Sequence, residues 1–140
     1  MKYSITELQY RKIILNYLNS VASEFIFEED HYEDDNWVDV LTSNGSDFGS
    51  LWFKSIRNNV GAMITQGCNQ ELALDEDFTQ EFEGLIPITH PKIFSQVVLE
   101  YFNSKTGHDC DCIEFYYFSG EYGKDGSPMD NAYKYNTKNR

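Results

Sequence analysis

The stretch that decides the fold is Cys112-Ile113-Glu114-Phe115-Tyr116-Tyr117-Phe118, which Gly120 follows closely. Its β-branched and aromatic residues are typical of a strand. Because the rings fall on both faces, we expect a central strand that is covered on each side. Upstream, Thr89-His90-Pro91 predicts the start of a helix, with Thr89 as its cap and Pro91 in the first turn, and Gly107 predicts its end.

The N-terminal part of the chain predicts another helix, from Ser4 to about Phe25. Ser4 and Glu7 have the spacing of a capping box. The apolar residues then recur at helical spacing, at Tyr10, Ile14, Tyr17, Leu18, Val21 and Phe25. This pattern predicts an amphipathic helix with one face in the core.

Short apolar runs separated by turn signals lie between and after these helices. They predict strands at Trp37–Leu41, Leu51–Ile56 and Val60–Thr65, and residues 131–135 predict a last edge strand or a loosely held tail. We therefore expect an α+β fold: an antiparallel sheet of about five or six strands, packed with the N-terminal helix and a second helix near residues 91–104. Residues 1–140 are expected to form a single globular domain, with 120–140 loosely ordered or an edge strand.

The net charge of −12 over 140 residues is the chain's least ordinary bulk property. It argues against direct binding to nucleic acid or to an anionic membrane surface, because both need clusters of Lys and Arg. The first residues lack the apolar core of a signal peptide, and no apolar run could span a bilayer. We expect a cytoplasmic protein with a cationic partner.

Three cysteines, Cys68, Cys110 and Cys112, make an odd number without the pattern of a disulfide framework. Reduced thiols are therefore expected. His108, Cys110 and Cys112 could share one strand face and supply zinc ligands, completed in space by Cys68, His31 or His90. Cys-x-Cys lacks a second matching pair, however, so the prediction is two small buried thiols and no metal or other cofactor.

Two windows of the sequence contain many carboxylates and no Lys or Arg. They span Glu24–Asp47 and Glu71–Glu83 and include aromatic residues. Charge steers an encounter, whereas buried rings lengthen the life of the complex, so this mixture favours a docking surface over an ordinary solvated one. The predicted partner-binding residues are Glu28, Glu29, Asp30, Tyr32, Glu33, Asp34, Asp35, Trp37, Asp39, Asp75, Glu76, Asp77 and Phe78.

Catalytic patterns are missing from the sequence. There is no Gly-x-Ser-x-Gly elbow, and Cys110 and Cys112 lie among Asp109, Asp111 and Glu114, whose charge opposes formation of a thiolate. Because carboxylates are so abundant, the presence of a close pair would carry no information about glycoside hydrolysis. We therefore expect a binding protein and not an enzyme.

A chain of this length with two unopposed acidic-aromatic windows and no catalytic signature resembles the immunity proteins of bacterial toxin–immunity systems, including contact-dependent growth inhibition. The resemblance is one of type and extends over the whole chain. It implies a cytoplasmic toxin inhibitor, a monomer that forms a heterodimeric complex with a cognate toxin domain. Many such toxins are nucleases, and a nuclease is basic where it holds phosphates.

Other classes of function remain open at this point. One is a nucleic-acid mimic that blocks a DNA- or RNA-binding host protein. Another is a small-molecule binder or enzyme with a pocket lined by Trp37, Trp52 and Tyr117. A third is a structural zinc domain.

Overall fold

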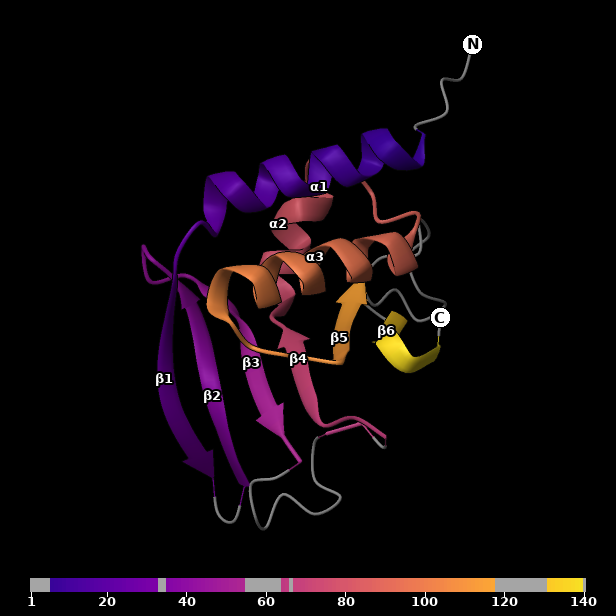
Figure 1. The fold of residues 1–140 in the computed structure, drawn as a ribbon. Helices are drawn as coiled ribbons and strands as arrows, with labels where there is room; N and C mark the ends of the chain where they lie inside the picture. The colour runs from indigo at the N-terminus through magenta and orange to yellow at the C-terminus, as the bar shows by residue number, and fades with distance from the viewer. Residues whose placement is uncertain (1–5, 33–34, 55–63, 66, 118–130, 140) are drawn as a thin grey trace, which may run out of the picture.

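A computed structural model describes residues 6–32, 35–54, 64–65, 67–117 and 131–139 (Figure 1). The described residues form three helices and a six-stranded sheet, so the expected α+β fold is confirmed. In chain order the elements are α1 (Glu7–Val21), β1 (Phe25–Tyr32), β2 (Asp35–Thr42), β3 (Asp47–Phe53), β4 (Gln70–Leu74), α2 (Glu76–Glu83), α3 (Pro91–Thr106), β5 (Cys112–Tyr117), β6 (Asn131–Asn136) and a 3₁₀ turn, η1 (Thr137–Asn139).

The strands lie in the sheet in the same order as in the chain, from β1 to β6. Neighbouring strands are antiparallel except for β4 and β5, which pair in parallel. The expectation of a wholly antiparallel sheet is therefore wrong at this one pair. A parallel pair needs a crossover connection, and here α2 and α3 supply it.

The helices cover one face of the sheet (Figure 1). Side chains from all three helices join Val40, Leu51, Leu72 and Ile113 in one buried core. Helix α1 packs on α2 and α3, and the hydroxyl of Tyr101 donates to the carbonyl oxygen of Ala22 at 3.2 Å. None of the described helices lies on the other face of the sheet (Figure 1).

The predicted helices exist, but their caps differ from expectation. Helix α1 begins with a capping box of Thr6 and Gln9 instead of Ser4 and Glu7. Helix α3 has His90 at its N-cap, not Thr89, with no side-chain hydrogen bond from the cap, and it ends at Gly107 as expected. Phe25 lies in β1, where its ring packs against Phe48 and Phe102.

The predicted strands are recovered in part. Residues 37–41 lie within β2, and the predicted edge strand at 131–135 is β6. Strand β5 lies inside the sheet, between β4 and β6, but the described helices cover one of its faces, and Tyr116 on the other face is exposed. The prediction of a strand covered on each side is therefore wrong. Residues 60–63 of the predicted strand Val60–Thr65, and most of the predicted tail, lie outside the described residues.

The parallel junction between β4 and β5 is held by Asp111. Its carboxylate accepts the backbone N–H groups of Asn69 and Gln70, at 3.1 and 3.0 Å, and lies 3.4 Å from the ammonium of Lys138. Burial alone would raise the pKa of Asp111, but these donors outweigh it and lower the pKa. Asp111 therefore ties the start of β4, β5 and the C-terminal turn together.

A disulfide between Cys68 and Cys112 also joins the start of β4 to the start of β5. The expectation of three reduced thiols is thus wrong, because the parallel pairing brings together two cysteines that lie 44 residues apart. Cys110 is free and buried, and its burial, with Asp111 and Asp109 adding to the effect, raises the pKa of its thiol to about 12. None of the described helices is long and apolar enough to cross a membrane.

Candidate acidic groove

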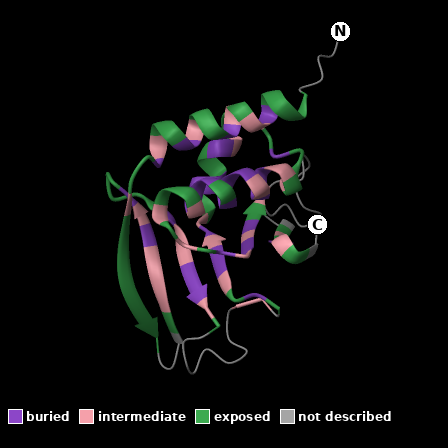
Figure 2. Cartoon of the chain, viewed as in Figure 1, coloured by how far each residue is buried: buried purple, intermediate pink, exposed green. Residues whose placement is uncertain are grey.

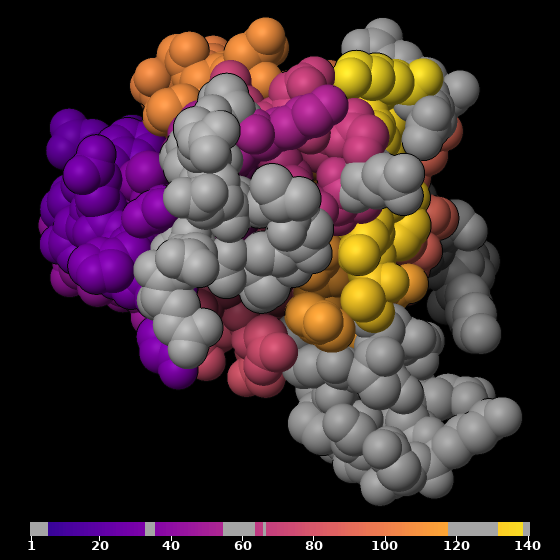
Figure 3. Space-filling view, turned by 90° about the horizontal axis from the view of Figure 1, so that it is seen from below, coloured from indigo at the N-terminus to yellow at the C-terminus, as the bar shows by residue number. Residues whose placement is uncertain are grey.

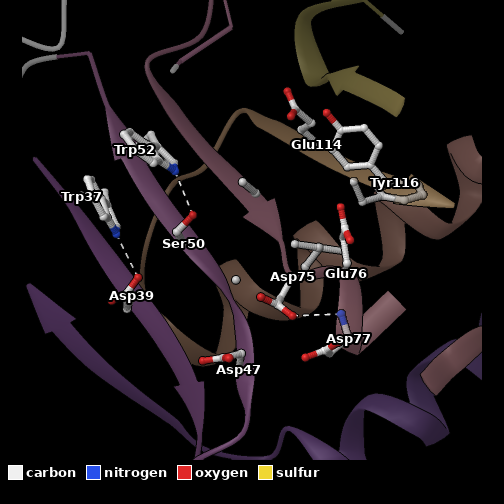
Figure 4. A pocket seen from close by; sticks show the side chains of 14 residues that line it. Trp37, Asp39, Asp47, Ser50, Trp52, Asp75, Glu76, Asp77, Glu114 and Tyr116 are labelled. Atoms are coloured by element: carbon white, nitrogen blue, oxygen red, sulfur yellow. Dashed lines mark hydrogen bonds between the residues drawn. The ribbon is translucent and has the colours of Figure 1, made fainter. Parts of the chain in front are cut away.

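A groove lies on the sheet face opposite the core, beside the first turn of α2 (Figure 4). Because side chains alternate along a strand, Leu72 and Leu74 of β4 face the core, while Ala73 between them faces the groove. The groove has a volume of about 680 Å³. The polar and aromatic residues that line it are Trp37, Asp39, Asp47, Ser50, Trp52, Asp75, Glu76, Asp77, Glu114, Phe115 and Tyr116.

Two tryptophans form one wall of the groove (Figure 4). The rings of Trp37 and Trp52 stack with centroids 5.0 Å apart and planes inclined by 24°. The indole N–H of Trp37 donates to Asp39 at 2.9 Å, and that of Trp52 donates to Ser50 at 2.8 Å. With both N–H groups satisfied, each ring is fixed in place, and Trp37 remains partly exposed to solvent.

Carboxylates form the floor and the opposite side of the groove. Asp39 of β2 and Asp47 of β3 lie toward the helical acids Asp75, Glu76 and Asp77, and Glu114 of β5 lies opposite the tryptophans (Figure 4). Asp75 is the N-cap of α2 and accepts the backbone N–H of Asp77 at 2.9 Å. The helix N-terminus carries a partial positive charge, which offsets some of the repulsion among these acids.

The pKa values of the inner carboxylates are raised by burial first and by this crowding second. Burial raises the pKa of Asp39, and the neighbouring Asp30 and Asp47 raise it further, while the hydrogen bond from Trp37 lowers it only in part. Burial also raises the pKa of Asp75, and the charges of Asp47 and Asp77 add to the effect. Carboxylates whose pKa is raised by their neighbours favour the approach of a positive group.

Little positive charge from the described residues reaches the groove. Within the described residues, the one ion pair at its edge joins Lys134 to Glu114 at 3.5 Å. No Lys or Arg of the described chain lines the groove. The groove therefore presents a negative surface around a tryptophan wall.

Comparison with known proteins does not assign the chain to a family. No family model, curated protein or solved structure matches the chain. The function must therefore be inferred from the groove and from the remaining surface of the molecule.

The fold brings together part of the predicted docking surface. Trp37 and Asp39 from the first acidic window meet Asp75, Glu76 and Asp77 from the second in this groove. Strand pairing places Asp30 opposite Trp37 and Glu28 opposite Asp39, so these two acids extend the same face toward the sheet edge. The two windows thus converge at one place.

Other predicted residues lie elsewhere. Phe78 is only 4% exposed and packs in the core against Phe48 and Tyr17, so it does not belong to the docking surface to which it was assigned. Tyr32 is exposed at the end of β1, and Glu29 lies on the opposite face of that strand from Glu28. Glu33, Asp34 and the side chain of Asp35 lie outside the described residues.

Sequence reasoning missed several groove residues. Asp47 lies in the first acidic window but was not among the predicted partner-binding residues. Ser50, Glu114 and Tyr116 come from strands whose exposed faces were not identified from the sequence. The aromatic pocket considered above needed Tyr117, but the ring of Tyr117 packs on Phe115, and its neighbour Tyr116 lines the groove instead. Alternation within β5 would have separated Glu114 and Tyr116 from the core residues, once one face was known to be open.

The candidate metal ligands do not assemble. Cys112 is bonded to Cys68, and His108 packs among the rings of Phe27, Phe53 and Phe102. Within the described part of the chain, no group of three or more His, Cys, Asp or Glu side chains is arranged to hold a metal ion.

A second, separate feature is the buried carboxylate of Glu71, which is 2% exposed. It accepts hydrogen bonds from the backbone N–H and the hydroxyl of Thr65, at 2.8 and 2.7 Å. Burial raises the pKa of Glu71 above its ordinary value of 4.5, because these two donors compensate the lost hydration only in part. Glu71 therefore holds Thr65 in place before β4, and its contribution to the free energy of unfolding depends on pH.

The Glu71→Gln variant is expected to change the pH dependence of stability. The folded state binds the proton of Glu71 more tightly than the unfolded state, so the wild-type free energy of unfolding falls as the pH rises from about 4.5 through the raised pKa. Glutamine does not titrate, so the variant's free energy of unfolding should not fall in this way. The difference between variant and wild type should therefore shift in favour of the variant as the pH rises from about 4.5 through the raised pKa. Urea unfolding at several pH values measures the difference. Glu100→Gln, on the exposed face of α3, is the matched control, and a Glu71→Gln difference that does not vary with pH would contradict the assignment.

Proposed function

We propose that the chain is a binding protein whose groove docks a basic protein. The observation that carries the proposal is the meeting of carboxylates from β2, β3, α2 and β5 around the stacked pair Trp37 and Trp52. Such a negative surface speeds the approach of a positive one and pairs with its Lys and Arg side chains. The partly exposed ring of Trp37 offers a flat face on which a guanidinium or ammonium group can stack.

The resemblance to immunity proteins gives the partner its class. We propose a cognate bacterial toxin domain, for example a nuclease of a contact-dependent growth inhibition system, which the chain neutralises as a monomer in a heterodimeric complex. A nuclease carries Lys and Arg where it holds phosphates, and these side chains match the groove in charge. In this proposal the chain has no catalytic role and needs no cofactor.

The proposal places the protein in the cytoplasm, where thiols are kept reduced. Cys68 and Cys112 do not line the groove. Partner binding is therefore expected from both the oxidised and the reduced chain.

Reversing two groove charges should weaken binding strongly. In the double variant Asp47→Lys with Glu76→Lys, two exposed carboxylates that face the groove become ammonium groups. We expect the dissociation constant for the cognate basic toxin domain to rise about a hundredfold at low salt, mainly through slower association. Surface plasmon resonance at two salt concentrations measures both rates, and the wild-type rate should fall as salt rises.

The matched control is Glu81→Lys with Glu100→Lys, two exposed acids outside the groove. Each substitution adds two positive units, so both variants carry −8 in place of −12. The control should bind within about threefold of wild type, because net charge alone steers weakly across a Debye length. Equal weakening in both variants, or no weakening in either, would reject the groove as the docking site.

A further inference from the structure

Strand β1 is an edge of the sheet with an exposed surface along nearly its whole length. From Ile26 to Tyr32 every residue is exposed, whereas β3 and β4 alternate with buried positions (Figure 2). No described helix or strand lies beyond it in the sheet (Figure 1). The view from below shows the first strands along one flank of the molecule (Figure 3).

No strand of the described chain pairs with the outer side of this edge. In an antiparallel pair, every second residue turns its N–H and C=O away from its neighbour strand. The N–H of His31 donates to the carboxylate of Asp30 at 2.8 Å, which marks His31 as one of the outward residues. By alternation, the N–H and C=O groups of Phe27 and Glu29 also point outward from the sheet.

Natural edge strands are commonly protected by proline, a bulge, short length or lysine. Strand β1 has eight residues, no proline and no lysine, and its pairing with β2 is regular throughout. The protection that it does carry is negative charge, at Glu28, Glu29 and Asp30. A second copy adding antiparallel about Glu29 would place these acids opposite one another, which is destabilising.

We propose that β1 is a docking edge for an extended basic segment of a partner protein, which adds to the sheet as a further strand. The three acids that repel a second copy attract such a segment, so charge complementarity selects this occupant. The inference rests on the proposed function only for the basic character of the partner, because the edge itself is a separate surface from the groove.

The side chains of β1 define the pattern of the incoming strand. Glu28 and Asp30 lie on the open face, where they would meet Lys or Arg at alternate positions. On the helix face, Phe27 is 40% exposed and its ring lies 5.3 Å from the ring of His108, which offers an apolar contact to the residue that pairs with Phe27. Glu29 shares this face and lies between Glu28 and Asp30. The expected segment therefore carries basic residues at alternate positions and an apolar residue opposite Phe27.

The test is an NMR titration of the isotope-labelled chain with a peptide of about ten alternating Lys and Val residues, a length that matches an ordinary strand. Its matched control has the same sequence and charge, but alternate backbone nitrogens are methylated and cannot donate. We expect slower amide exchange at Phe27 and Glu29 with the first peptide, and at least about tenfold weaker binding of the methylated one. Equal affinity of the two peptides, or no change in exchange along β1, would overturn the proposal.

A protein variant gives a second, independent readout. Glu29→Pro removes an outward N–H while leaving the hydrogen bonds between β1 and β2, and Glu29→Ala removes the same charge but keeps the N–H. The proline variant should bind the unmethylated peptide several-fold more weakly than the alanine variant, and equal binding would count against strand addition. The two proposals can fail independently. If the groove is not the docking site, the double variant Asp47→Lys with Glu76→Lys will bind the basic domain like wild type, while β1 still binds the peptide.

Discussion

Replacing Gly49 with alanine is expected to lower the free energy of unfolding by about 3 kcal/mol or more. A Cβ atom at this position in β3 would overlap the carbonyl oxygen of Ala73 and lie 3.2 Å from the Cα of Leu74, both in the backbone of β4. Backbone atoms cannot turn aside as a flexible side chain can, so the two strands must separate. Urea unfolding monitored by tryptophan fluorescence measures the loss, and Trp52, three residues further along β3, reports on the same region.

The control for this prediction is Gly45→Ala, in the turn between β2 and β3. Gly45 has a φ of 87° and open space around its Cα, so alanine there meets only the conformational penalty of a left-handed residue. That penalty is about 1–2 kcal/mol. A Gly49→Ala protein that is no less stable than Gly45→Ala would contradict the close approach of β3 and β4. Because Gly49 also lines the groove, any folded Gly49→Ala protein should show altered partner binding as well.

Reduction of the Cys68–Cys112 disulfide is expected to cost up to about 4 kcal/mol. Chain entropy predicts this upper value for a cross-link between residues that are 44 apart, since reduction frees a long loop in the unfolded state. Native contacts on both sides of the bond remain, so the reduced chain should still fold, with a lower denaturation midpoint. Chemical unfolding with and without a phosphine reductant measures the difference.

Two controls define this experiment. The Cys68→Ala and Cys112→Ala double variant should be insensitive to the reductant, whereas Cys110→Ala should keep the full difference between oxidised and reduced protein. Because burial raises the pKa of the Cys110 thiol to about 12, iodoacetamide should modify it slowly in the folded protein at neutral pH. Three rapidly alkylated thiols in the unreduced protein would contradict the disulfide.

Local patterns in the sequence succeeded where the signal is local. The helix that begins at Pro91 and ends before Gly107 could be placed from residue types alone, because a proline in the first turn and a left-handed glycine at the end are set by backbone geometry. The apolar periodicity of the N-terminal region likewise identified Tyr10, Ile14 and Leu18 as the buried face of α1. The N-cap was predicted two residues too early, at Ser4, because Thr6 and Gln9 have the same capping-box spacing as Ser4 and Glu7.

Two elements with high charge were missed for a shared reason. Strand β1 carries Glu28, Glu29 and Asp30, and α2 carries four acids in eight residues, so both resemble solvated surface. An edge strand can expose charge on both faces, and a short helix needs only a narrow apolar stripe, here Phe78 and Phe82. Asp75 followed by that i, i+4 pair was the signal that could have identified α2.

By itself, the sequence determined the net charge, the two acidic windows, the ends of α3 and the apolar face of α1, because each depends on composition or on residues within a few positions of one another. Only the tertiary structure decided that Asp39 and Asp47 meet Asp75 and Glu114, and that Cys68 meets Cys112. These encounters follow from which strands become neighbours, above all from the parallel pairing of β4 with β5 across two helices. Strand alternation assigns a residue to a face, but the residue that lies beside it on that face is chosen by packing of the whole core.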